Sequence, residues 1–165
     1  GEAAAEAWAK GVKENLARKP QGNDRAQVKA VFQGECDVSL GNTYYMGLMQ
    51  TNDKEPEQKQ WAAAVNVVFP NQKDRGTHVN VSGAAVTKSA KNKENAIKLI
   101  EFLSADTAQK IYAEDNFEYP VKAGVAASAV VSSWGTFKAD DVLLSRVAEQ
   151  RTLATRIMDR VRFDN

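Results

Sequence analysis

Two adjacent tyrosines, Tyr44 and Tyr45, with Asn42 two positions before them, are the residues of this sequence best suited to bind a ligand. On a β-strand, neighbouring side chains point to opposite faces, so one ligand could not meet both rings. On the first turn of a helix or in a loop, two adjacent hydroxyl groups can converge from one wall. The pair therefore predicts a binding site if it lies at the start of a helix. The alternative interpretation is that the two aromatic side chains only pack against the rest of the protein.

A position at a helix start would also change the chemistry of these hydroxyl groups. The partial positive charge and free N–H groups of a helix N-terminus favour phenolate over phenol, whose pKa is otherwise about 10. The same N–H groups can form an anion pocket. A phenolate is a hard anionic oxygen donor that suits a trivalent ion such as Fe(III), as in haem proteins with tyrosine ligation.

The motifs that could support catalysis fail on type or spacing. His78 is the one histidine of the sequence, and it lies beside alternating valines without any Gly-x-Ser-x-Gly turn, which favours a structural role. Lys88-Ser89 resembles the end of a phosphate-binding loop, but Ser82 and Thr87 stand where that loop requires glycine. The residue spacings that are typical of zinc sites and of calcium-binding loops are missing as well. An enzyme is therefore the least favoured class.

Composition excludes further classes. The 165 residues include 22 Lys+Arg and 21 Asp+Glu, a net charge of +1, which argues against nucleic-acid binding through bulk charge. The arginines of residues 140–165 spread around a helix and are matched by acidic residues. No apolar run approaches the roughly 20 residues of a membrane-spanning helix. The single cysteine, Cys36, cannot form an intrachain disulfide.

Hydrophobic periodicity indicates helices alternating with short strands, which is typical of an α/β fold. Trp8, Val12 and Leu16 would form the buried face of the first helix, and Ser104 would cap the helix that runs through Ile111. Helices are expected near residues 5–16, 24–32, 44–50, 96–103, 104–111 and 142–161, and strands at 36–40, 65–69 and 79–81. Asn23 or Asp24 is expected to cap the second helix, and Asn42 or Thr43 the helix with the tyrosine pair.

The segment Gly41-Asn42-Thr43-Tyr44-Tyr45-Met46-Gly47, directly after the expected strand at residues 36–40, resembles the ferric-binding-protein family. These are the periplasmic substrate-binding proteins of bacterial Fe(III) ABC transporters. The resemblance extends over nearly the whole chain, and its other segments are residues 17–25, 76–84, 95–103 and 118–121.

The resemblance implies a periplasmic-binding-protein-like two-lobe fold of type II, an α/β fold whose lobes close on iron. It assigns residues 1–75, with the tyrosine pair, and the helical tail at 126–165 to the C-terminal lobe. Residues 76–125 would cross to the N-terminal lobe. Full members are longer, and the part without a counterpart here is their N-terminal half. The chain is thus interpreted as a C-terminal half, whose partner is the missing N-terminal half or a second copy of the chain.

The resemblance also implies the site. Tyr44 and Tyr45 would be Fe(III) ligands, while Asn42 and Asn23 would hold a synergistic anion such as carbonate or phosphate. The protein would bind ferric iron in the periplasm and deliver it to an ABC transporter permease, with no catalytic residues and no nucleic-acid partner. The sequence starts without Met and without a signal peptide, which fits an exported, processed product.

Two other functions remain open at this point. The chain could bind another small anion or an organic acid, with the tyrosines stacking on it. It could also be an interaction fragment that binds no metal.

Overall fold

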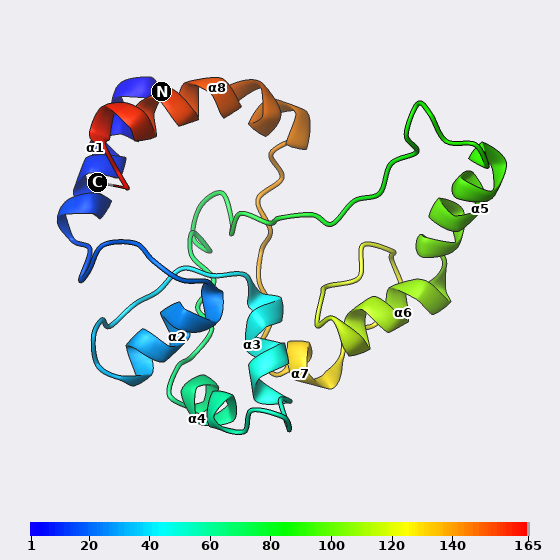
Figure 1. The fold of residues 1–165 in the computed structure, drawn as a ribbon, viewed down its shortest axis with the longest axis horizontal. Coiled ribbons are helices and arrows are strands. Elements are labelled where there is room, and N and C mark those ends of the chain that lie inside the picture. The colour runs from blue at the N-terminus through cyan, green and yellow to red at the C-terminus, as the bar shows by residue number, and fades with distance from the viewer. Residues whose placement is uncertain (165) are drawn as a thin grey trace.

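The computed structural model describes residues 1–164, and within them the chain forms eight helices joined by long irregular connections (Figure 1). In chain order they are α1 (Glu2–Glu14), α2 (Asp24–Phe32), α3 (Thr43–Gln50), α4 (Glu57–Ala63), α5 (Lys93–Leu103), α6 (Asp106–Asp115), α7 (Ala129–Ser132) and α8 (Leu144–Val161). Each helix expected from the sequence is present. None of these helices is long and apolar enough to cross a membrane.

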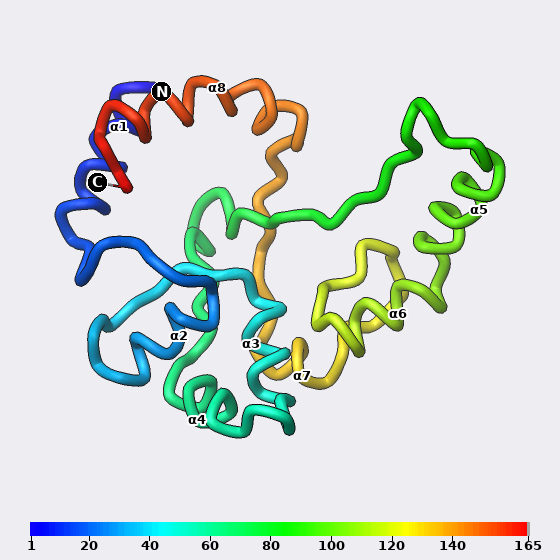
Figure 2. Tube along the Cα trace, in the orientation of Figure 1, coloured from blue at the N-terminus to red at the C-terminus, as the bar shows by residue number. Residues whose placement is uncertain are grey.

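Most of the helices gather in separate groups, which the tube view makes easy to follow (Figure 2). Helices α2, α3 and α4 pack on one another. Helices α1 and α8 come from opposite ends of the sequence and lie side by side, so the two ends of the chain meet. Helices α5 and α6 contact each other and lie apart from the other groups, at the right of the view.

The group that carries the tyrosine pair has a small apolar core. Met46 and Met49 of α3 are buried against Ala62 of α4, and partly buried apolar residues pack around them. Trp134, just after α7, is one of these, and its indole N–H also donates to the Gln50 side chain over 3.3 Å. Helix α3 is therefore fixed on several sides, which gives the residues of its first turn a defined position.

Helix α1 packs on α8 through a different face from the one expected. Ala9 is buried against Ile157 and Val161, whereas Trp8 is 64% exposed. Leu16 is exposed as well and lies beyond the end of the helix. The prediction that these two large residues are buried is wrong, because α8 contacts α1 on the side where the small Ala9 permits close approach.

The cap expected for α2 is confirmed, and the cap expected for α6 is wrong. The side-chain oxygen of Asn23 accepts a hydrogen bond from the backbone N–H of Ala26 over 3.1 Å. Ser104 instead follows the last residue of α5, where its hydroxyl donates to the carbonyl of Ile100 over 3.2 Å. Ala105 then takes the N-cap position of α6 without a side-chain bond.

The strands expected at residues 36–40, 65–69 and 79–81 do not form. Those segments are irregular connections, and the one β-type pairing within residues 1–164 is an isolated parallel bridge between Thr77 and Ala139. A strand requires a neighbouring segment for its backbone hydrogen bonds. None of the three segments has such a neighbour in the part of the chain that the structure describes.

Candidate functional site

The tyrosine pair lies on the first turn of α3, the location that lets two adjacent hydroxyl groups meet one ligand. Helix α3 begins at Thr43 with Asn42 as its N-cap residue, so Tyr44 and Tyr45 follow directly. Their ring centroids are 4.5 Å apart and the ring planes are tilted by 38°. Both side chains are half-buried. The structure thus brings the two rings together at a helix start, as the sequence predicted.

The electrostatics of Tyr44 differ from the expectation. Hydrogen bonding with Tyr45 raises the pKa of the Tyr44 phenol, and burial and the nearby charges of Tyr45, Asp24 and Glu118 raise it further. The expectation that the position at a helix start favours phenolate at Tyr44 is therefore wrong. The neighbouring groups favour the protonated phenol.

Asp24 connects the start of α2 with the start of α3. Its carboxylate oxygen Oδ1 accepts a hydrogen bond from the backbone N–H of Asn42 over 2.7 Å, and the Asn42 side-chain amide lies 3.4 Å from the same oxygen. The Asn42 side chain makes no capping bond to α3. Both donors of Asn42 therefore face the Asp24 carboxylate.

Asn23, the second residue expected at an anion, lies beside Asp24 but has a local role. Its side-chain oxygen caps α2, and its carbonyl accepts a bond from the Gln27 side chain over 3.2 Å. The capping bond explains why the chain has asparagine at this position. Binding of an anion by Asn23 stays a prediction.

Arg25 is a site residue that the sequence analysis missed. Its guanidinium carbon lies 5.8 Å from the centroid of the Tyr45 ring, within the range of a cation–π contact. Its Nε is buried and has no hydrogen-bond partner among the described residues. The signal in the sequence was the position of Arg25 in the first turn of the expected helix at residues 24–32. A charged residue there lies close to the residues that cap the helix.

Glu118 is the other missed residue, and it reaches the pair through tertiary packing. Gly47, three residues after Tyr44, lies so close to Phe117 that a Cβ atom at position 47 would overlap the Phe117 ring. The next residue, Glu118, accepts a hydrogen bond from the Ser82 hydroxyl over 2.8 Å. Contact between Gly47 and Phe117 therefore helps to place the Glu118 charge near Tyr44.

This contact predicts a large effect of Gly47→Ala on stability. The added methyl group has no room beside Phe117, so we expect the free energy of unfolding to fall by about 2 kcal/mol. Urea denaturation measures the change. Gly11→Ala in α1 is the matched control, because nothing lies within 4 Å of a Cβ atom there. In that variant the better helix propensity of alanine should leave stability equal or higher. Equal stability of both variants would contradict the packing argument.

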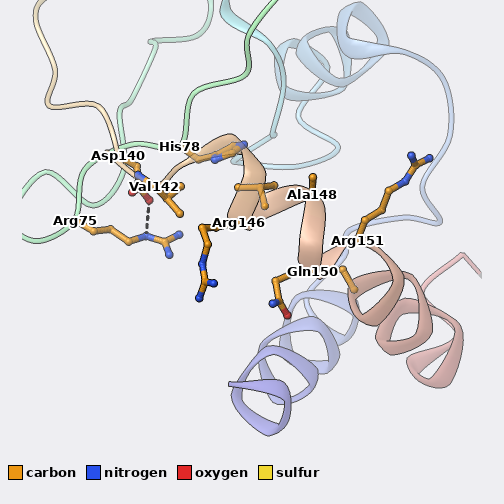
Figure 3. A pocket seen from close by; sticks show the side chains of 10 residues that line it. Arg75, His78, Asp140, Val142, Arg146, Ala148, Gln150 and Arg151 are labelled. Atoms are coloured by element: carbon orange, nitrogen blue, oxygen red, sulfur yellow. Dashed lines mark hydrogen bonds and ion pairs between the residues drawn. The ribbon is translucent and has the colours of Figure 1, made fainter.

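The tyrosine pair is not part of a cluster of the usual metal-binding side chains, and a groove lies elsewhere on the chain. Among residues 1–164 no group of three or more His, Cys, Asp or Glu side chains could hold a metal ion. A groove of about 820 Å³ runs along the start of α8 (Figure 3). The Nε of Arg75 and an oxygen of the nearly buried Asp140 carboxylate form an ion pair of 3.3 Å at this groove. His78 is exposed at the same groove rather than packed in a core.

Comparison with known proteins defines the class of this chain. The sequence pattern of the family described as bacterial extracellular solute-binding protein matches residues 1–110, so the chain belongs to that family. It is 52% identical over 160 residues to iron uptake protein A1 of Synechocystis sp., a match that covers 96% of this chain and 44% of the relative. It is 33% identical over 159 residues to the major ferric iron-binding protein of Neisseria meningitidis serogroup B, covering 96% of this chain and 46% of the relative.

Solved structures agree with the sequence matches. A Trichodesmium protein, IdiA or FutA, in complex with iron and citrate ligands superposes with a TM-score of 0.92 at 48% identity, over 98% of this chain and 51% of that one. Ferric iron-binding protein A of Mannheimia haemolytica, in an open conformation, superposes with a TM-score of 0.89 at 49% sequence identity. The match covers 97% of this chain and 49% of that one. The expected type II periplasmic-binding-protein fold is confirmed. The chain spans about half the length of these relatives, which are named for iron uptake or ferric iron binding and not for a reaction.

Proposed function

We propose that this chain is the tyrosine-bearing half of a periplasmic ferric-iron-binding protein, and that Tyr44 and Tyr45 are ligands of Fe(III). The observation that carries the proposal is the geometry of the pair, with adjacent phenol groups on the first turn of α3 and ring centroids 4.5 Å apart. Relatives named for iron uptake or for ferric iron binding match nearly the whole chain, which supports the same cargo.

The charges around the pair suit a site that ionises only when a cation binds. Asp24 and Glu118 add negative charge near Tyr44, which attracts a trivalent cation and keeps the free phenol protonated. Arg25 lies over the ring of Tyr45 and stabilises added electron density there. Binding of Fe(III) would displace the phenol protons and form phenolate ligands, so each iron ion taken up releases protons.

Two phenolates leave part of the ferric coordination sphere open. The other ligands would come from an anion, water or the opposite lobe. In the assignment we propose, residues 1–75 and 126–165 form the C-terminal lobe and residues 76–125 cross to the N-terminal lobe. Separation of α5 and α6 from the other helices supports this division (Figure 1). Closure of the lobes around the ion would present one closed surface to an ABC transporter permease.

A titration with Fe(III) tests the proposal directly. Phenolate-to-iron charge transfer gives a visible absorption band, so we expect colour to develop when ferric citrate is added to the protein. Citrate alone is the control. Binding of citrate without a visible band in the iron titration would overturn the iron site and favour the alternative, a binding site for an organic acid.

The unpaired surfaces of the chain predict association. Leu99 and Phe102 of α5 are 56% and 49% exposed, and the irregular segments at residues 36–40 and 65–69 have no strand partner within residues 1–164. Exposed apolar faces and unpaired backbone promote assembly. We expect the 165-residue chain to form a dimer or larger assembly, or to bind the N-terminal half of its fold. Light scattering combined with mass spectrometry measures this, and a stable monomer at high concentration would contradict it.

A further inference from the structure

The backbone conformation of Phe117 is unusual for a residue with a large side chain. Phe117 directly follows Asn116, the C-cap residue of α6, and has a left-handed backbone with a φ of 56°. This conformation is unfavourable for any residue with a Cβ atom, and glycine usually takes it at the end of a helix. The chain has a phenylalanine there instead, and its side chain is only 7% exposed. A packing contact of the ring therefore offsets the unfavourable backbone.

That contact is with the helix that carries the tyrosine pair. The Phe117 ring packs against α3 at Gly47, where a Cβ atom would overlap both Cβ and Cγ of the phenylalanine. Gly47 lies three residues after Tyr44, and residues at this spacing share one side of a helix. Met46 and Met49 hold α3 against α4. The ring thus supports the side of α3 that carries Tyr44.

The segment that carries Phe117 is tied to both α5 and α6. Gln109 of α6 is buried, and its side-chain oxygen accepts a hydrogen bond from the backbone N–H of Val121 over 2.9 Å. Its amide donates to the carbonyl of Leu103, the last residue of α5, over 2.9 Å. We therefore expect residues 117–121 to move together with α5 and α6.

A second aromatic side chain of this segment makes a similar contact. The ring of Tyr119 meets Phe137 edge-on, with centroids 5.1 Å apart, and Phe137 stacks on Phe69 at 4.4 Å. Phe69 and Phe137 lie in the parts of the chain that we assign to the C-terminal lobe. Phe117 and Tyr119 thus both join the crossing segment to that lobe, and Phe117 does so at the helix with the tyrosine pair.

We propose that Phe117 is a positioning residue of the iron site, whose ring transmits movement of the α5–α6 group to the first turn of α3. This inference rests on the proposed iron site and lobe division. The ring acts through Gly47 and is not itself a ligand. Iron bound by the pair restricts the α5–α6 group through this contact. Because coupling between two sites is reciprocal, the position of α5–α6 in turn affects how tightly the pair holds iron.

Two replacements of Phe117 separate positioning from stability. Phe117→Ala and Phe117→Gly both delete the ring, but only glycine relieves the left-handed backbone, so Phe117→Gly should have the higher urea midpoint. Groups that orient a metal ligand contribute about 10–100-fold to affinity, so both variants should lose about tenfold or more in Fe(III) affinity, by the same factor. Phe117→Leu keeps an apolar side chain beside Gly47 and should retain more affinity than either.

Arg162→Gly is the matched control. Arg162 also has a left-handed backbone at the end of a helix, with a φ of 50°, but it ends α8 in the α1–α8 group. Glycine there should raise the urea midpoint and leave the iron affinity unchanged.

The experiment combines titration with ferric citrate, at fixed citrate concentration, with hydrogen exchange measured with and without iron. In the wild type, iron should slow exchange of the backbone amides of residues 106–116, although α6 supplies none of the proposed ligands. This protection should disappear in both variants that lack the ring. Circular dichroism checks that the helices are retained, and Phe117→Leu gives the comparison with wild type if the smaller residues prevent folding.

The outcomes separate this inference from the proposed function. Iron affinity that is unchanged in the Phe117 variants, or that follows their urea midpoints, would overturn the role of Phe117 and leave the iron site standing. Protection of α6 by iron that persists without the ring would overturn it as well. Failure of the wild type to bind Fe(III) would overturn the proposed function, and the role of Phe117 with it.

Discussion

Replacement of either tyrosine by phenylalanine should remove most of the iron colour. Tyr44→Phe and Tyr45→Phe each delete one anionic oxygen donor and keep the ring, so the packing at the start of α3 persists. Loss of groups that only orient a metal ligand already weakens binding by about 10–100-fold, and loss of a ligand itself should cost more than about 100-fold in Fe(III) affinity. Titration with ferric citrate, followed at the visible band, measures both affinity and colour.

Tyr112→Phe is the control for this pair of variants. Tyr112 is also half-buried, but it lies on α6, in the separate α5–α6 group, so its removal should leave the band and the affinity unchanged. Circular dichroism of all three variants checks that the helices are retained. Unchanged colour in both Tyr44→Phe and Tyr45→Phe would show that the pair does not ligate iron.

The helices could be predicted from the sequence because their signals are local. Periodic apolar residues, and Asn23 placed directly before Asp24, indicated α2 together with its cap, and the capping bond to Ala26 is present. Packing faces were harder to predict. On α1 the sequence favoured Trp8 as a core residue, but the buried residue is Ala9, because the position of α8 and not apolarity alone determines which side is covered.

The strands could not be predicted with the same certainty because pairing is not local. The valines at residues 65–68 have the composition of a buried strand, yet this segment has no hydrogen-bonded neighbour in the described part of the chain. Apolar alternation indicates only that a segment can pair. We propose that its partners belong to the part of the relatives' fold that lies outside the matched half.

The site shows the same division between local and distant signals. Tyr44 and Tyr45 are adjacent in the sequence, so their proximity could be inferred once a helix start was expected. Glu118 reaches the pair only because Phe117 packs against Gly47, a contact between residues far apart in the chain. Hydrogen bonding with the adjacent Tyr45 and burial contribute most to the raised pKa of Tyr44, and the charges of Asp24 and Glu118 add to it.

Ionisation of two phenols on iron binding predicts a steep dependence of iron affinity on pH. Tyr44 and Tyr45 must each lose a proton to become phenolate ligands, and the pKa of Tyr44 is raised by hydrogen bonding with Tyr45, by burial and by nearby negative charge. Protons therefore compete with Fe(III) at all pH values below the phenol pKa. Each proton released changes the apparent affinity by about tenfold per pH unit, so two phenols should give about 100-fold per unit. Affinity should fall as pH drops.

Competition against a chelator of known proton affinity, from neutral to mildly acidic pH, measures this slope after correction for the chelator's own protons. The single variants sharpen the test. Tyr45→Phe retains one ionisable phenol, so its remaining weak binding should depend on pH with about half the logarithmic slope, near tenfold per unit. Tyr112→Phe should keep the full slope. If the wild-type affinity did not depend on pH, the tyrosines would bind the ion as neutral hydroxyl groups or would not bind it. If the wild type and Tyr45→Phe had equal slopes, the released protons would come from groups other than Tyr45.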